Sequence, residues 1–170
     1  MGQIHKDVKR GRGRPPIRSD AATRRLIIDA ASQEFQANGY AGTCVEAVAQ
    51  RAALEHILIA YGALALDAET IAINRLVIAE SDRFPEIAVA FYETALVQTN
   101  RAMESWLRRQ CKRGSIRLKD PHAASGMLRG MMVMEPQRAV MLGQRAVPNA
   151  EEIANRARDA SQLFLNGCRA

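Results

Sequence analysis

The chain has 170 residues, and its net charge of +6 sits at one end: residues 1–25 hold eight basic and two acidic side chains, whereas residues 26–170 balance. A chain of this length can bury a core, no apolar run is long enough to span a membrane, and the first residues lack the apolar stretch of a signal peptide. We therefore expect a cytoplasmic protein that contacts a polyanion at its amino end, or one with a solubilising basic tail.

Residues 1–18 are expected to form a disordered basic arm, because glycine and proline exclude a stable helix and little apolar surface is present. Within the arm, Arg12-Gly13-Arg14-Pro15 resembles the core of an AT-hook, in which extended arginines lie in a narrow A·T-rich minor groove. Arg10, Arg12 and Arg14 are therefore predicted to contact DNA, with little sequence choice.

Residues 19–54 are expected to form two short amphipathic helices, the front half of a helix-turn-helix unit. Gly39 should end the first helix, and Thr43-x-x-Glu46 is a capping box that should open the second. The free amides at that end favour phosphate, so we expect it to be open to solvent. The predicted DNA contacts of this segment are Arg24, Arg25, Thr43 and Arg51.

Residues 55–66 are expected to be a core helix of a following bundle and not the helix that reads DNA. A reading helix needs polar or basic side chains for base edges and phosphates, but no lysine or arginine occurs from Ala52 to Asn74. His56 is interpreted as a partly buried histidine, because no second metal ligand lies at a suitable spacing.

The next helices are predicted from their caps and breakers. Asp67 and Asp120 are expected N-caps, and the apolar residues of segment 71–78 should be buried on most sides. Pro85 should open the longest helix of the chain, and Gly114 should end it. This rod is the expected spine of a helical bundle.

Two amphipathic helices, 121–143 and 149–168, are predicted to close the chain. Pro136 should kink or interrupt the first, and Asn149-x-x-Glu152 is a capping box for the second. These helices either cover their own core or pair with the same two helices of a second subunit.

Two sets of residues, which together span most of residues 20–168, match family patterns. The first set is Leu26-Ile27-Ile28-Asp29-Ala30-Ala31, Phe35, Gly39-Tyr40, Thr43, Val45 and Ala49-x-x-Ala52. The second set is Glu80-x-x-Arg83-Phe84-Pro85-Glu86, Phe91-Tyr92-Glu93 and Asp120-Pro121-x-Ala123-Ala124 with Gly130. The first set resembles the N-terminal domain of the TetR family of transcriptional repressors, and the second resembles an AefR-like C-terminal domain in that family. The resemblance implies an all-α homodimer whose last two helices form the dimer contact, and a small-molecule effector that releases DNA.

The chain departs from this family after Leu54. Ala53 replaces the family's turn glycine, and the expected Ser/Thr-rich recognition helix with its aromatic end is absent. A segment is therefore expected to be missing between Leu54 and Glu55. The predicted architecture is all-α, with an incomplete helix-turn-helix domain at 19–54 and a helical ligand-binding and dimerisation domain at 55–170.

An effector pocket is predicted where the longest helix meets its neighbours. Its apolar wall would suit a small hydrophobic effector. The alternative for each of these residues is that it belongs to the ordinary hydrophobic core and lines no pocket. The predicted wall consists of Tyr61, Leu76, Phe91, Met103, Trp106, Met127 and Met131.

Two functions stay open at this stage. The first is a regulator, a repressor by resemblance, that binds double-stranded DNA and is released by the effector. The second is a dimerising, ligand-binding helical protein that has lost sequence-specific DNA binding. An enzyme is disfavoured, because no nucleophile or carboxylate is arranged around the histidines and no phosphate-binding glycine loop occurs. No cofactor is expected, and the separated Cys44, Cys111 and Cys168 indicate reduced thiols without a metal site.

Overall fold

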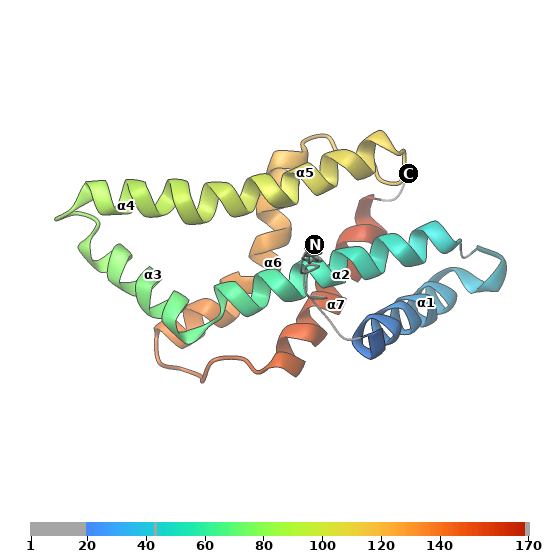
Figure 1. Ribbon diagram of the computed structural model, residues 1–170, viewed down its shortest axis with the longest axis horizontal. Coiled ribbons are helices and arrows are strands. Elements are labelled where there is room, and N and C mark those ends of the chain that lie inside the picture. Colours follow the sequence, from blue (N-terminus) through green and yellow to red (C-terminus); the bar gives the residue numbers. More distant parts are fainter. Residues whose placement is uncertain (1–19, 43, 169–170) are drawn as a thin grey trace, which may run out of the picture.

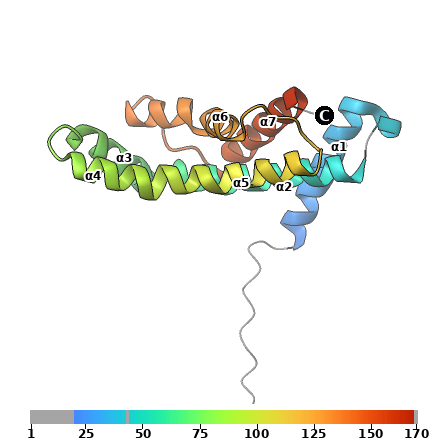
Figure 2. The same cartoon turned by 90° about the horizontal axis from the view of Figure 1, so that it is seen from above.

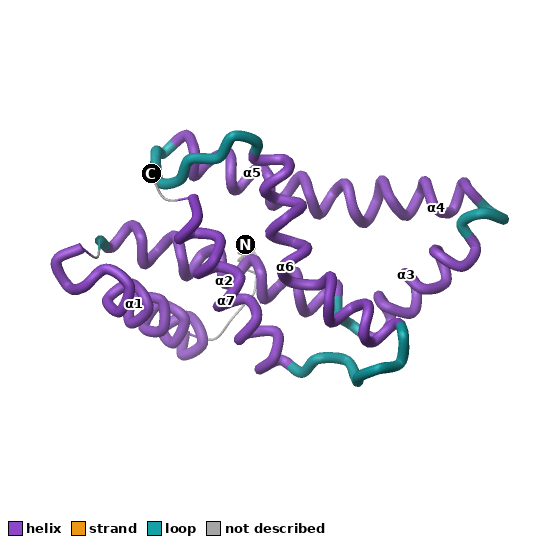
Figure 3. Tube along the Cα trace, turned by 180° about the vertical axis from the view of Figure 1, so that it is seen from behind, coloured by secondary structure: helices purple, strands orange, loops and turns teal. Residues whose placement is uncertain are grey.

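The computed structural model describes residues 20–42 and 44–168, and these residues form an all-α fold, as predicted (Figure 1). No strand occurs within these two ranges (Figure 3). The predicted arm, residues 1–18, lies outside them. The elements in chain order are α1 (Asp20–Gly42), α2 (Val45–Ala65), α3 (Ala68–Glu80), α4 (Pro85–Phe91), the π-helix η1 (Tyr92–Val97), α5 (Gln98–Lys112), α6 (Pro121–Met141) and α7 (Ala150–Cys168).

The largest difference from the sequence prediction is α2, which runs unbroken through Leu54 and Glu55. The predicted helices on either side of this junction are two halves of one element, because no glycine or proline separates them. The predicted domain boundary after Leu54 falls inside it. The buried positions recur at helical spacing through the junction: Val48, Arg51, Ala52, Leu54, Glu55, Leu58 and Gly62.

The connection between α1 and α2 also differs from the prediction. α1 continues past Gly39 to Gly42, so Gly39 does not end it. The N-cap of α2 is Cys44, whose Sγ accepts a hydrogen bond from the backbone amide of Ala47 at 3.4 Å. The predicted cap, Thr43, lies outside the described residues. The amino end of α2 is open to solvent, as expected, since Val45 is 80% exposed.

The caps predicted for the helices after α2 are confirmed. The carboxylates of Asp67 and Asp120 accept hydrogen bonds from the first free amides of α3 and α6. Asn149 and Glu152 form a reciprocal capping box before α7, in which each side chain accepts from the other's backbone amide at 2.9 Å. These signals are local in sequence, which is why they can be predicted without the fold.

The longest helical rod runs from Pro85 to Lys112 through α4, η1 and α5 (Figure 1). Pro85 holds the first position, where its missing amide hydrogen removes no helical bond. Gly114 follows the end of the rod with φ of 74°, a conformation that favours glycine. The π-helical turn in the middle is not predicted by the sequence pattern. Thr94 and Thr99, within and just after it, each donate to the carbonyl four residues earlier at 2.6 Å.

α6 remains helical across Pro136, so of the two predicted outcomes, a kink or an interruption, the interruption is wrong. The ring removes the amide that would bond the carbonyl four residues earlier. The ribbon changes direction partway along this helix (Figures 1 and 3).

The main core lies between two layers of helices. Figure 2 shows α2 and the α4–α5 rod in one layer and α6 with α7 in the other. Gly62 lets α2 approach the second layer closely, because a Cβ at this position would lie 2.9 Å from side-chain atoms of Ile153 and Met132. The buried core residues contributed by the four helices include Leu54, Leu58, Met103, Trp106, Leu107, Leu128, Met132, Ile153 and Leu165.

α3 is far less buried than its apolar pattern predicts. Ile71 is buried, but Ile73, Leu76 and Ile78 are 50%, 62% and 66% exposed. The helix contacts α2, α4 and α6, and its buried and half-buried residues lie along one side. A pattern that is apolar on several sides does not show which side packs against a neighbour.

Within the described residues, no single helix is long and apolar enough to cross a membrane. The pair formed by α2 and α3 has the length and composition of a membrane span, but the two helices are bent by 62° relative to each other.

Candidate nucleic-acid interface and effector region

α1 lies beside the amino-terminal half of α2 at one end of the molecule (Figure 1). Three small buried side chains, Ala30, Val48 and Ala52, form the contact between the two helices. Small residues allow the two backbones to approach closely. This pair is the described part of the segment predicted to bind DNA.

Arg51 is not available to a phosphate, which corrects its prediction as a DNA contact. Its guanidinium is fully buried against the equally buried carboxylate of Glu34 on α1. Nε and Nη2 both lie 2.6 Å from Glu34 Oε1, and Nη1 donates to Gln33 Oε1 at 3.2 Å. The partner is 17 residues earlier in the chain, a distance at which helical spacing carries no information. Arg51 therefore joins α2 to α1.

The first turns of α1 carry the predicted contacts that remain exposed. Arg24 and Arg25 are both open to solvent. They line a hollow of about 760 Å³ together with Ile27 and Ile28, which are 49% and 55% exposed. The other predicted contacts, Arg10, Arg12, Arg14 and Thr43, lie outside the described residues.

A buried carboxylate, Glu55, joins α2 to α7. Ser161 donates to Glu55 Oε1 at 3.4 Å, and Arg158 of the same helix lies 3.8 Å from Asp29 of α1. Burial raises the pKa of the Glu55 carboxyl, and the charges of Arg158 and Arg51 oppose this effect. Glu55 is not among the site residues predicted from sequence, although its position four residues after Arg51 places it on the buried stripe of α2.

Two of the seven predicted pocket residues lie mostly in solvent. Leu76 on α3 and Met127 on α6 are 62% and 70% exposed. Burial raises the pKa of the Tyr61 phenol, which packs against the core from α2. The structure brings four of the predicted residues together in or against the core, and a fifth is half-buried on α4. These five are Tyr61, Met103, Trp106, Met131 and, on α4, Phe91.

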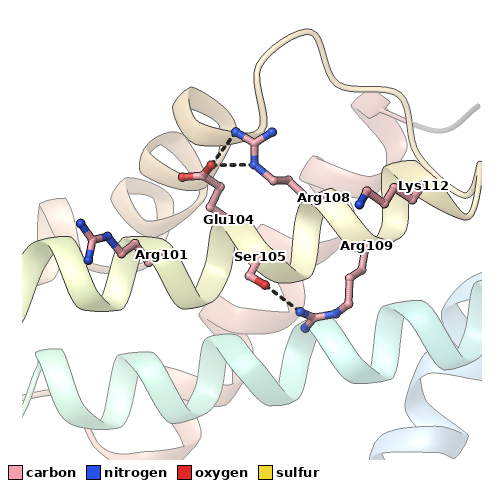
Figure 4. A pocket seen from close by; sticks show the side chains of 6 residues that line it. All are labelled: Arg101, Glu104, Ser105, Arg108, Arg109 and Lys112. Carbon is pink, nitrogen blue, oxygen red and sulfur yellow. Dashed lines mark hydrogen bonds and ion pairs between the residues drawn. The ribbon is translucent and has the colours of Figure 1, made fainter.

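Two further hollows are lined by other residues. One, of about 260 Å³, lies between α6 and α7 and includes Leu66, Pro136 and Ile153. The other, of about 290 Å³, lies on α5 and is lined by polar and charged side chains (Figure 4). Within the described part of the chain, no group of three histidine, cysteine, aspartate or glutamate side chains could hold a metal ion.

Comparison with protein families matches residues 52–167 to the C-terminal domain of AefR-like transcriptional repressors. The match covers well over half of the chain. No curated protein sequence matches the chain.

Solved structures similar to this fold include two proteins. One is described as a TetR-family transcriptional regulator from Mesorhizobium loti; it is 22% identical with a TM-score of 0.60. The other is described as the flavonoid-responsive regulator FrrA; it is 20% identical with a TM-score of 0.51. Each comparison covers 88% of this chain and 98% of the other. At this identity the likeness establishes the fold.

Proposed function

Because the chain belongs to the TetR family of transcriptional regulators and carries an AefR-like C-terminal domain, we propose that it binds double-stranded DNA as a homodimer, represses transcription while bound, and is released by a small hydrophobic effector. The observation that carries this proposal is the family match over residues 52–167. A regulator of this kind acts where the chromosome is, so we expect a cytoplasmic protein.

Contacts to DNA are proposed at the amino end of the molecule. Arg24 and Arg25 are exposed on α1, and the amino end of α2 leaves free amides open to solvent, which favour a phosphate group. Arg10, Arg12 and Arg14 of the arm are proposed to lie in an A·T-rich minor groove. These contacts supply affinity with little base discrimination.

The dimer contact is proposed on the last two helices. Met127 and Met134 on α6 are 70% and 50% exposed, and Leu163 on α7 is 66% exposed. The same faces of a second copy would cover these side chains in an isologous four-helix contact.

The effector is proposed to enter the apolar core between the two helix layers, beside Tyr61, Met103, Trp106 and Met131. A flavonoid is a suitable first probe, because one structural relative is described as flavonoid-responsive. Binding should raise the melting temperature of the protein and weaken its hold on DNA.

The proposal is tested by fluorescence anisotropy of a labelled duplex titrated with the intact chain at several salt concentrations. We expect the double variant R24Q/R25Q to lower the magnitude of the salt slope by about 2, since each phosphate contact contributes roughly 0.9. The control R75Q/R83Q removes the same charge from exposed positions on α3 and in the turn that follows it and should leave the slope unchanged. Absence of duplex binding by the parent chain at low salt would contradict the proposal.

A second candidate function is favoured by the continuous helix α2. Since α2 passes through the Leu54–Glu55 junction directly into the core, it is not followed at this junction by a separate helix that could enter a major groove. The protein would then be a dimerising, ligand-binding member of the family without sequence preference. Selection from a pool of random duplexes separates the two functions: enrichment of one motif supports the regulator, and uniform recovery supports the second candidate.

A further inference from the structure

Residues 101–119 form a second basic region that the overall charge balance of residues 26–170 conceals. This stretch holds seven basic residues and one acidic residue, a net charge of +6 that equals that of residues 1–25. The remaining positions after residue 25 carry the compensating negative charge. Charge segregated in this way produces a local field that a balanced total does not predict.

The basic side chains share one face of α5. Met103, Trp106, Leu107 and Gln110 form the buried face of this helix. The opposite side carries the hollow of about 290 Å³, and Figure 4 shows its lining side chains along the helix. The lining residues are Arg101, Glu104, Ser105, Arg108, Arg109 and Lys112.

The protein itself neutralises little of this charge. Glu104 is the single acidic residue of the stretch, and it already pairs with Arg108 at 2.6 Å and with His122 at 2.8 Å. Hydrogen bonds from His122 and Arg108 lower the pKa of the Glu104 carboxyl, which keeps it ionised. Within the described residues, Arg101 and Lys112 make no ion pair.

Stabilisation of the helix end does not account for the whole region. Arg109 and Lys112 lie in the last turn of α5, where positive charge is favourable against the helix dipole. This effect fades within one turn, so it does not explain Arg101 near the start of α5, nor Arg117 and Lys119 beyond its end.

The position and chemistry of the basic face fit the phosphate backbone of a duplex. α5 lies in the same layer of helices as α2 (Figure 2), and its basic end lies at the end of the molecule that holds the exposed start of α2 and helix α1 (Figures 1 and 2). From Arg101 to Lys112 the helix spans roughly 17 Å, a length over which one DNA strand carries about five phosphates. No large apolar side chain of α5 is exposed, whereas helices that lie on a lipid surface insert such side chains.

We propose that the face of α5 formed by Arg101, Arg108, Arg109 and Lys112 is a second binding surface for the phosphate backbone of double-stranded DNA. The inference rests on the proposed function, because the α5 face adds a contact to a DNA complex in which α1 and the arm make the first contacts. It gives affinity without base recognition and extends the bound length of duplex beyond the amino end.

The test compares two double variants that lose the same charge. R101Q/K112Q removes the two charges of the basic face that make no ion pair in the described residues. The control R75Q/R83Q removes two exposed charges from α3 and from the turn that follows it, away from the proposed dimer contact. Both variants should keep the helix content and melting temperature of the parent chain. Salt titrations of a random-sequence duplex, followed by fluorescence anisotropy, should show the α5 variant losing about 2 of the slope magnitude, while the control keeps the parental slope.

Other outcomes have distinct meanings. If the parent binds duplex and both double variants retain its slope, or both lose slope equally, the α5 surface is not a DNA contact, while the proposed function stands. If the parent does not bind duplex, the proposed function fails as well. Binding of the parent to vesicles containing anionic phospholipid that is lost in the α5 variant, with duplex binding unchanged, would overturn the proposal in favour of a lipid surface.

Discussion

Arg51 and Glu34 form a fully buried ion pair between α1 and α2. Removal of one partner from such a pair leaves a charge without compensation in a poorly hydrated site. We expect Glu34→Ala to lower the free energy of unfolding by about 3 kcal/mol or more, measured by urea denaturation. The double replacement E34L/R51M should lose much less. Equal losses in the single and double variants would show that the pair is not the origin of the effect.

Glu55 should make stability depend on pH. Burial raises its pKa in the folded chain above the ordinary value of 4.5, so the folded chain holds this proton at a pH where the unfolded chain has released it. The associated stability is present below about pH 4.5 and is lost as pH rises through the raised pKa. Glu55→Gln should remove this decline. Urea unfolding between pH 4 and pH 8 tests it, and parallel profiles for parent and variant would contradict it.

Single-residue roles are predictable from sequence only where the partner is close in the chain. The caps Asp67, Asp120 and Asn149 bond amides two or three residues away. Arg51 has its partner on another helix, and a sequence pattern cannot distinguish an arginine that faces phosphate from one that faces a buried carboxylate.

The start of α7 offers a test at the scale of one element. Asn149 and Glu152 satisfy each other's backbone amides, and α7 packs against both α2 and α6. Asn149→Ala should lower the free energy of unfolding by about 1 kcal/mol, seen as a lower denaturation midpoint. Glu151→Gln, one position earlier than Glu152 and exposed, is the control and should change stability by less than about 0.5 kcal/mol. An unchanged midpoint for Asn149→Ala would show that the capping box does not stabilise the folded chain.

Helix ends were more predictable than helix continuity and exposure. Glycine, proline and capping side chains act within a turn, so the starts of α3, α4, α6 and α7 follow from sequence. Continuity of α2 through Leu54 follows from the absence of glycine and proline at the junction and from an unbroken stripe of buried positions. A helix boundary was predicted there because the residues after Leu54 depart from the family pattern. The exposure of Leu76 and Met127 depends on how the other helices are placed around them.

The whole molecule should dimerise through α6 and α7. M127E/L163E places charges on both proposed contact faces, which should convert the dimer to a monomer because a buried unpaired charge is strongly unfavourable. Leu76→Glu on α3, at a similarly exposed apolar position, should leave the dimer intact. Light scattering after size exclusion measures both masses. A monomeric parent, or a dimer that survives M127E/L163E, contradicts the proposed contact.

Two regions of equal net charge, residues 1–25 and residues 101–119, set the electrostatic character of the molecule. The first is evident from the sequence because it is terminal and unbroken by acidic residues over most of its length. The second is hidden in the total charge by acidic residues elsewhere in the chain. The structure reveals it, because α5 buries one face and exposes its basic side chains on the other.

The mass of the complex between the intact chain and a single duplex at low salt tests the central claim most directly, because one measurement reports both dimerisation and DNA binding. Light scattering should give the mass of one duplex plus two chains, and that complex should dissociate as salt is raised. Separate elution of free duplex and free protein at low salt would contradict the account.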